Sequence, residues 1–147
     1  MKAIVYTEYG SPDVLQLKEV EKPTPSDDEV LVKIHAASVN YGDWAALIGS
    51  PFLVRLMNGP IRPRNKILGD DIAGRVEAVG RNVKQFQPGD EVFGFSHFGA
   101  FAEYRCVTED YLALKPGNMS FEEGAAVPIA AITALQGLRD KGQIQSG

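Results

Sequence analysis

Apolar and polar residues alternate along most of the chain up to about residue 114, and the alternation is broken by Gly, Pro and Asp. A period of two is typical of strands that bury one face. Met1–Tyr6 and Val14–Val20 are two such runs. The turn residues Gly10–Asp13 between them favour a hairpin-like connection and argue against a helix. These two runs are therefore predicted to pair.

Longer strands follow the first pair. In Glu29–Ala37 the alternation places Val30, Val32 and Ile34 on one face of a strand. Asp71–Gly80 alternates in the same way and is predicted to be half exposed. Short strands separated by turns at this spacing indicate a barrel or a sandwich. The remaining strand-like runs are Glu91–Phe95, Ala100–Val107 and Tyr111–Leu114.

The pattern changes to a helical period near residue 120. Ser120 followed by Glu123 is the capping-box signature of a helix start. A second helix is predicted over Ile129–Asp140. Its apolar face consists of Ile132, Leu135 and Leu138.

Composition narrows the function classes. The 147 residues include 15 Lys and Arg against 19 Asp and Glu, a net charge of −4, and 44% are hydrophobic. That balance describes a globular domain with its own core and argues against a nucleic-acid partner. No apolar run approaches the roughly 20 residues that cross a membrane, and the start lacks a secretory pattern. The single cysteine, Cys106, excludes an intrachain disulfide. We therefore expect a cytoplasmic protein without a membrane partner.

The chain is poor in metal ligands and in nucleotide-binding motifs. A catalytic zinc requires about three protein ligands, and the sequence supplies only Cys106, His35 and His97 outside its carboxylates, with no paired spacing. His35 is expected to face solvent from a strand, His97 to lie in a loop, and Cys106 to be inert filler. Phosphate loops and Gly-rich dinucleotide fingerprints are absent from the sequence. We therefore expect no metal site and no dinucleotide binding of the usual kind by this chain alone.

Polar residues gather at two strand ends, Ser38–Trp44 and Leu68–Gly74. They belong to a series of seven motifs: Met1–Val5, Gly10–Leu15, Glu29–Lys33, Ala37–Asp43, Gly69–Val76, Pro88–Val92 and Gly99–Tyr104. In this order the motifs resemble the medium-chain dehydrogenase/reductase superfamily. The chain is similar to its quinone oxidoreductase branch over nearly its whole length.

The resemblance implies a mainly β fold with a few helices, the GroES-like β-barrel (α+β). It implies a GroES-like catalytic domain over residues 1–126. Residues 127–147 would be a helix leading into a nucleotide-binding Rossmann domain that is absent from this chain. On this interpretation the chain is an N-terminal fragment, inactive alone, of an NADPH-dependent enzyme.

The resemblance also separates the chain from zinc-dependent relatives. Alcohol dehydrogenases of the superfamily carry Cys-His where this chain has Asn40-Tyr41, and Gly-His-Glu where it has Gly69-Asp70-Asp71. Without a Lewis acid to polarise an alcohol or a ketone, the zinc-free branch reduces activated substrates. The implied reaction is hydride transfer from NADPH to a quinone or an α,β-unsaturated carbonyl.

Four residues match functional positions of the branch. Asn40 matches an asparagine beside the nicotinamide, Asp43 an acid that shapes its loop, and Thr133 a helix threonine that contacts the nicotinamide. Tyr41 is the candidate proton or hydrogen-bond donor to the substrate oxygen. Structural alternatives stay open: Asn40 bonding backbone at a strand end, Asp43 capping a Trp44–Ile48 helix, and Thr133 as helix filler.

Three expectations concern partners. The basic segment Pro51–Lys66 resembles a substrate-side flap and could also touch an anionic cofactor group, or be a surface loop without function. The unpaired apolar face of the Ile129–Asp140 helix predicts homo-oligomers. A stand-alone GroES-like binding or chaperonin-like module without enzymatic activity is the alternative function.

Overall fold

The computed structural model describes residues 1–145. Strands β1 (Lys2–Val5) and β2 (Gln16–Glu19) form the expected antiparallel hairpin, with Ala3 opposite Lys18. Val14, which was assigned to the second strand, instead ends a short 3₁₀ turn, Pro12–Val14. Pro12 fixes the backbone at the start of that turn, so the strand begins only at Gln16.

Five further strands form one antiparallel sheet in the order β6-β3-β4-β5-β7. Their bounds are β3 (Glu29–Ala37), β4 (Asp71–Val79), β5 (Glu91–Phe95), β6 (Tyr104–Thr108) and β7 (Leu112–Leu114). Within residues 1–145 the sheet stays open between β6 and β7, and isolated bridges join β1 to Ala102 and Ile67. The predicted combination of antiparallel sheet and helices is confirmed, but helices take about as much of the chain as strands, so the fold is mixed and not mainly β. The strands do not close a hydrogen-bonded barrel in the part of the chain that the structure describes.

The expected Ala100–Val107 strand starts four residues late. The Ala100 and Phe101 N–H groups donate to the carbonyls of Gly69 and Leu68, and the Ile4 N–H donates to Phe101. This segment therefore crosses the loop before β4 and joins β1, a non-local pairing that alternation alone does not reveal. Tyr111 likewise ends a short turn, and β7 begins after it.

The main core is built mostly from side chains of the five-stranded sheet. Val30, Val32, Ile72 and Val92 are fully buried there. Strand β4 is more buried than expected, because only Arg75 and Glu77 among its nine residues are exposed. Side chains of period two thus build the core that the sequence predicted.

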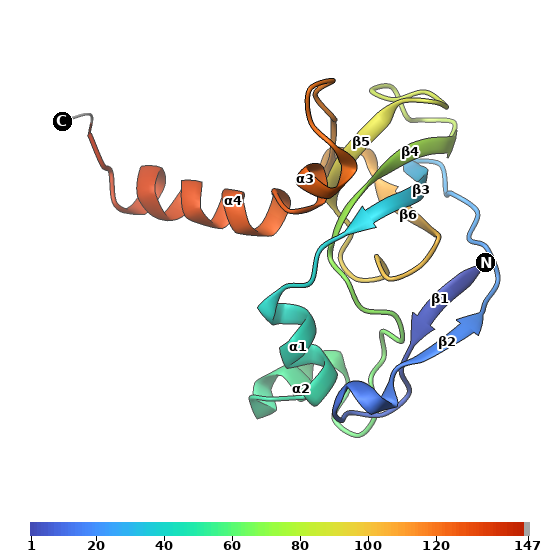
Figure 1. Ribbon diagram of the computed structural model, residues 1–147, viewed down its shortest axis with the longest axis vertical. Coiled ribbons are helices and arrows are strands. Elements are labelled where there is room, and N and C mark those ends of the chain that lie inside the picture. Colours follow the sequence, from blue (N-terminus) through green and yellow to red (C-terminus); the bar gives the residue numbers. More distant parts are fainter. Residues whose placement is uncertain (146–147) are drawn as a thin grey trace.

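Helices α1 (Tyr41–Ile48) and α2 (Phe52–Asn58) follow β3 and enclose a second small core (Figure 1). Tyr6 of the segment after β1 is 1% exposed and packs there with Ala46, Leu47 and Leu68. The Tyr6 hydroxyl accepts a hydrogen bond from the Asn58 side chain, 2.9 Å away. The hairpin and the two helices are therefore held together through Tyr6.

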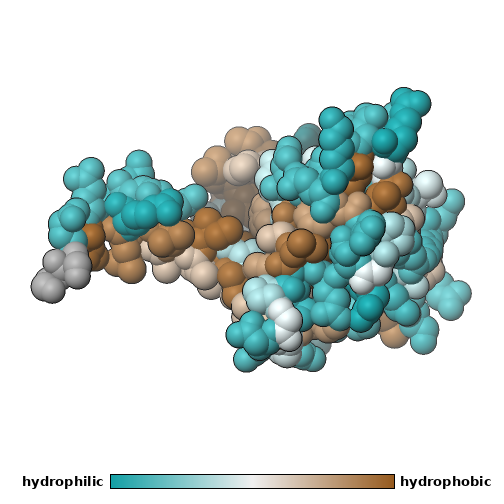
Figure 2. Space-filling view, turned by 90° about the horizontal axis from the view of Figure 1, so that it is seen from above, coloured by the Kyte–Doolittle hydropathy of each residue, from teal (hydrophilic) through white to brown (hydrophobic). Residues whose placement is uncertain are grey.

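The last two helices are α3 (Phe121–Ala125) and α4 (Pro128–Leu135), and α4 continues into a π-helical turn over Gln136–Lys141. The predicted capping box holds, because the Ser120 and Glu123 side chains each accept from the other's N–H. Helix α4 projects from the sheet (Figure 1) and is hydrophobic along one side and hydrophilic along the other (Figure 2). Ile132, Leu135 and Leu138 are 51%, 49% and 57% exposed, respectively. Among residues 1–145 no helix is long and apolar enough to cross a bilayer.

Candidate functional site

The buried carboxylate of Asp71 joins three segments that are distant in sequence. Asp71 is the first residue of β4 and is fully buried. Its Oδ2 accepts hydrogen bonds from Ser38 Oγ at 3.1 Å and from Asn40 Nδ2 at 3.0 Å. Its two oxygens also accept from the Ile129 N–H of α4 at 3.2 and 3.3 Å. Asp71 therefore fixes the entry to α1 and the start of α4 against the sheet.

Asn40 and Asp43 form the start of α1. Asn40 is the N-cap residue, so the helix begins at Tyr41 and not at Trp44 as expected. Asp43 Oδ2 accepts from the Asn40 N–H at 2.8 Å, and Asp43 Oδ1 accepts from the Gly69 N–H at 2.8 Å. With 3% of its surface exposed, Asp43 ties the helix start to the loop before β4. Asp43 thus helps to cap α1, which is the structural alternative given above. The N-cap residue itself is Asn40, and Asp43 is the third residue of the helix.

Asp70 is held by a turn of unusual backbone geometry. Its Oδ1 accepts from the Phe98 N–H at 2.7 Å, and its carbonyl accepts from the Ser96 N–H at 2.6 Å. Three consecutive residues have positive φ: 49° at His97, 77° at Phe98 and 91° at Gly99. Non-glycine residues rarely adopt this conformation, and such strain concentrates at functional sites.

Asp70 also lines a hollow of about 330 Å³ over α1 and α2. Apolar side chains make up much of its wall, including Ala46, Val54, Met57 and Phe98. A carboxyl group in such a wall can hydrogen-bond to the oxygen of a flat apolar substrate. The sequence analysis did not single out Asp70 as a candidate site residue, and its place in the wall of this hollow makes it one.

Thr133 borders a second hollow, of about 270 Å³, beside α4. Phe95, Tyr111 and Ile132 are among its other lining residues. The His97 ring meets the Phe95 and Tyr111 rings edge-on, with centroids 4.2 and 4.4 Å apart. His97 lies in a loop as expected, yet it adjoins a hollow that contains a predicted site residue.

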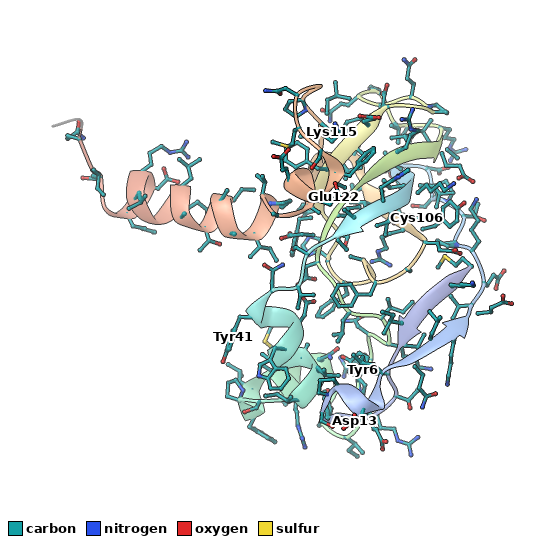
Figure 3. All side chains as sticks on the ribbon, in the orientation of Figure 1. Tyr6, Asp13, Tyr41, Cys106, Lys115 and Glu122 are labelled. Carbon is teal, nitrogen blue, oxygen red and sulfur yellow. The ribbon has the colours of Figure 1, made fainter. Side chains whose placement is uncertain are left out.

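Tyr41 is 79% exposed on α1, where Figure 3 labels it. It lines neither the hollow beside α4 nor the hollow over α1 and α2. Asn40 and α4 are brought together through Asp71, whereas Tyr41 stands at the helix surface. The four predicted residues therefore surround one region without sharing one cavity.

Burial controls the acid–base behaviour of this region. Burial raises the pKa of Asp43 and of Asp70, and repulsion by the Asp71 carboxylate raises both pKa values further. Repulsion by Asp43 adds to the rise at Asp70. The backbone N–H groups bonded to these carboxylates act in the opposite direction and lower the pKa of each. A carboxyl group with a raised pKa that lines a hollow is a candidate proton donor.

Side chains that could bind a metal do not cluster in the part of the chain that the structure describes. Among residues 1–145 no group of three or more His, Cys, Asp or Glu side chains is arranged to hold a metal ion. His35 is exposed and stacks on Phe121, with ring centroids 4.5 Å apart. Burial raises the pKa of the Cys106 thiol to about 11, as suits an unreactive filler residue.

The lining of the hollow beside α4 is compatible with a flat aromatic ring such as a nicotinamide. Its apolar wall suits a flat ring, and the Thr133 hydroxyl can both donate to and accept from a carboxamide. The phosphates have no comparable cradle in the sequence, which lacks a Gly-rich phosphate loop. The nicotinamide portion is therefore the part of such a cofactor that this hollow would suit.

The chain is similar to known proteins in sequence and in fold. Residues 26–117 match the family described as alcohol dehydrogenase GroES-like domain. The chain is 42% identical to 2-methylene-furan-3-one reductase of Solanum lycopersicum, over 97% of this chain and 38% of that protein. It is 38% identical to the chloroplastic NADPH-dependent alkenal/one oxidoreductase of Arabidopsis thaliana, over 94% of this chain and 37% of that protein.

The fold agrees with these sequence relationships. The structure of the quinone oxidoreductase from Coxiella burnetii superposes with a TM-score of 0.87 at 34% identity, covering 100% of this chain and 46% of that one. The chain thus spans less than half the length of the proteins it matches.

Proposed function

Because the chain belongs to the alcohol dehydrogenase GroES-like domain family, within the medium-chain dehydrogenase/reductase superfamily, we propose that it is the catalytic-domain part of a zinc-independent reductase. The substrates would be quinones or α,β-unsaturated carbonyls, and the reductant NADPH. Residues 1–126 would form the catalytic domain, and α4 would lead into the nucleotide-binding domain. The names of the reductases that the chain resembles support this substrate class.

The observation that carries the proposal is the hydrogen-bond network of Asp71. Asn40 Nδ2 and the Ile129 N–H both donate to this carboxylate, so the α1 entry and the α4 start have fixed positions. Thr133 lies one helical turn beyond Ile129, beside its apolar hollow. The network thus preorganises the two segments that would flank a nicotinamide ring.

The chemistry requires a hydride and a proton. NADPH, when bound, supplies the hydride to the β-carbon of an enone or to a quinone. This chain would bind the flat apolar substrate beside Asp70 and would deliver the proton to the substrate oxygen. Tyr41 is the phenol proposed as that donor, and Asp70 and His97 are the competing acids beside the two hollows.

The donor types at the two strand ends support the proposed zinc independence. Asn40 and Tyr41 replace a Cys-His pair, and amide and phenol groups are poor zinc ligands. Asp71 is engaged by the Ser38, Asn40 and Ile129 donors, which would have to be displaced before it could bind a metal. Without a Lewis acid, substrates must already be activated as electrophiles.

A substrate panel on the product of the complete reading frame tests the proposal. We expect NADPH oxidation with 1,4-benzoquinone and but-3-en-2-one, no turnover of cyclohexanone, and no loss of rate with a zinc chelator. Cyclohexanone reduction abolished by the chelator would overturn the proposal, and so would the absence of NADPH binding. The second of these results would favour the stand-alone binding module.

A variant panel on the same protein identifies the proton donor. Tyr41→Phe is expected to lower the rate constant of turnover by about 100-fold, the usual contribution of a general acid. Asp70→Asn and His97→Gln are the matched comparisons, each changing one competing acid. A normal rate for Tyr41→Phe beside a large loss in either comparison would reassign the donor.

A further inference from the structure

A hollow of about 400 Å³ lies between the β1–β2 hairpin, residues 64–67 and the start of β6. It shares no lining residue with the hollow beside Thr133, and it shares only Asn65 and Phe98 with the hollow over α1 and α2. Its apolar wall includes Ile67, Phe98 and Tyr104. This volume lies in the range of cavities that take small organic ligands.

Three cationic side chains line this hollow, although the chain as a whole is acidic. They are Arg64, Lys66 and Arg105, and the carboxylate among the lining residues is Glu21. None of the ion pairs among residues 1–145 includes any of the three cations. Like charges around one hollow repel one another unless an anion compensates them.

Arg105 carries a more specific signal. Its Nε is buried and has no hydrogen-bond partner within the described chain. Its Nη2 donates to the Ser96 carbonyl at 3.3 Å, a long contact. Buried donors are almost always paired, so an orphaned guanidinium nitrogen beside a hollow calls for an acceptor.

The lack of a side chain at Gly99 leaves room for the Arg105 guanidinium. A Cβ at Gly99 would lie 2.9 Å from Arg105 Cδ and 3.0 Å from Nε. Glycine at φ 91° therefore lets the Arg105 side chain lie directly against the backbone. Packing, and not an ion pair, fixes Arg105 at the wall of the hollow.

We propose that this cationic pocket, formed by Arg64, Lys66 and Arg105, binds a small organic anion. The ligand carries a phosphate or carboxylate group on an apolar body. The anionic group is paired with Arg64, Lys66 and the guanidinium of Arg105, since guanidinium groups match oxyanions with parallel donors. The apolar body lies against Phe98 and Tyr104. The proposal is independent of the proposed reductase activity.

Titration of the chain with phenyl phosphate and with benzoate, with phenol as the neutral control, tests the pocket. We expect saturable binding of at least one anion by calorimetry, weakened by added salt, and no binding of phenol. In nuclear magnetic resonance spectra the Arg105 Nε–H signal should shift with the same dissociation constant. The anion that binds more tightly identifies the preferred group.

Variants at exposed positions keep the test independent of folding. Arg64→Gln combined with Lys66→Gln should weaken binding by about tenfold or more, as expected for loss of charge-assisted bonds. Arg62→Gln is the matched control, because Arg62 is an exposed arginine of the same segment that does not line the pocket. The proposal is overturned if no anion binds below about 10 mM, if phenol binds equally well, or if Arg62→Gln weakens binding as much as the double variant.

Discussion

Replacing Asp43 by asparagine tests the framework of the candidate site. Both carboxylate oxygens of Asp43 are used, since Oδ1 accepts from the Gly69 N–H and Oδ2 from the Asn40 N–H, each at 2.8 Å. An asparagine has one acceptor oxygen and one NH₂ donor. Whichever way the amide turns, one backbone N–H then faces another donor. Asp43→Asn therefore disconnects α1 from the loop before β4 or opens its own cap.

The magnitude follows from two opposing effects. Losing one hydrogen bond to a charged acceptor in a buried position costs about 1.5 to 3 kcal/mol. The neutral amide recovers part of this cost, because burial of the carboxylate, which raises the pKa of Asp43, no longer opposes folding. We expect the free energy of unfolding to fall by about 2 kcal/mol.

Urea unfolding provides the measurement. Trp44, the single tryptophan, lies on α1 beside Asp43 and reports through its fluorescence, while circular dichroism reports on the whole chain. Asp110→Asn is the matched control, because it removes the same charge at an exposed position. If Asp43→Asn unfolds within about 0.5 kcal/mol of Asp110→Asn, the proposed role of the two bonds is refuted.

Four further predictions concern other parts of the structure. Gly69→Ala should lower the free energy of unfolding by about 2 kcal/mol or more in urea titrations, because φ is 92° there and a Cβ would lie 2.6 Å from the Phe101 ring. Cys106 should resist iodoacetamide in the native chain at pH 8 and react after unfolding, since burial raises its pKa to about 11. Asp70→Asn should raise the melting temperature at pH 8, because burial raises the pKa of Asp70 and the stability of the native chain therefore falls as the pH rises through that pKa. Below about pH 4 Asp70 is protonated in both states, and the variant should show no gain in melting temperature. The exposed apolar face of α4 predicts self-association, and replacing both Leu135 and Leu138, which are 49% and 57% exposed, by serine should reduce it, as measured by sedimentation equilibrium.

The sequence predicts the strands and helices that interactions between neighbouring residues determine. Strand β3 has the expected bounds, because Val30, Val32 and Ile34 alternate along one face, although Leu31 on the other face is buried as well. The α3 capping box was also predicted, since Ser120 and Glu123 interact within one turn. Elements determined by distant partners were less predictable. The Ala100–Phe101 segment bonds to residues 67–69 and β1, which the local pattern does not reveal.

The residues of the candidate site also differ in whether local or distant interactions position them. Asn40 and Asp43 could be located from the sequence through the family resemblance, whereas the helix start at Tyr41 with Asn40 as its N-cap was not predicted. The role of Asp71 depends on Ile129, 58 residues away, and so required the structure. His97 was correctly placed in a loop, but its contact with Phe95 and Tyr111 arises from a left-handed turn that composition does not predict.

Isotope transfer tests the central claim most directly. The product of the complete reading frame would be supplied with NADPH deuterated at C4 and with an enone, after its metal content has been measured. The account predicts deuterium at the β-carbon of a saturated ketone, at a rate that does not depend on bound zinc. Deuterium at the carbonyl carbon of an allylic alcohol, or transfer that requires zinc, would contradict it.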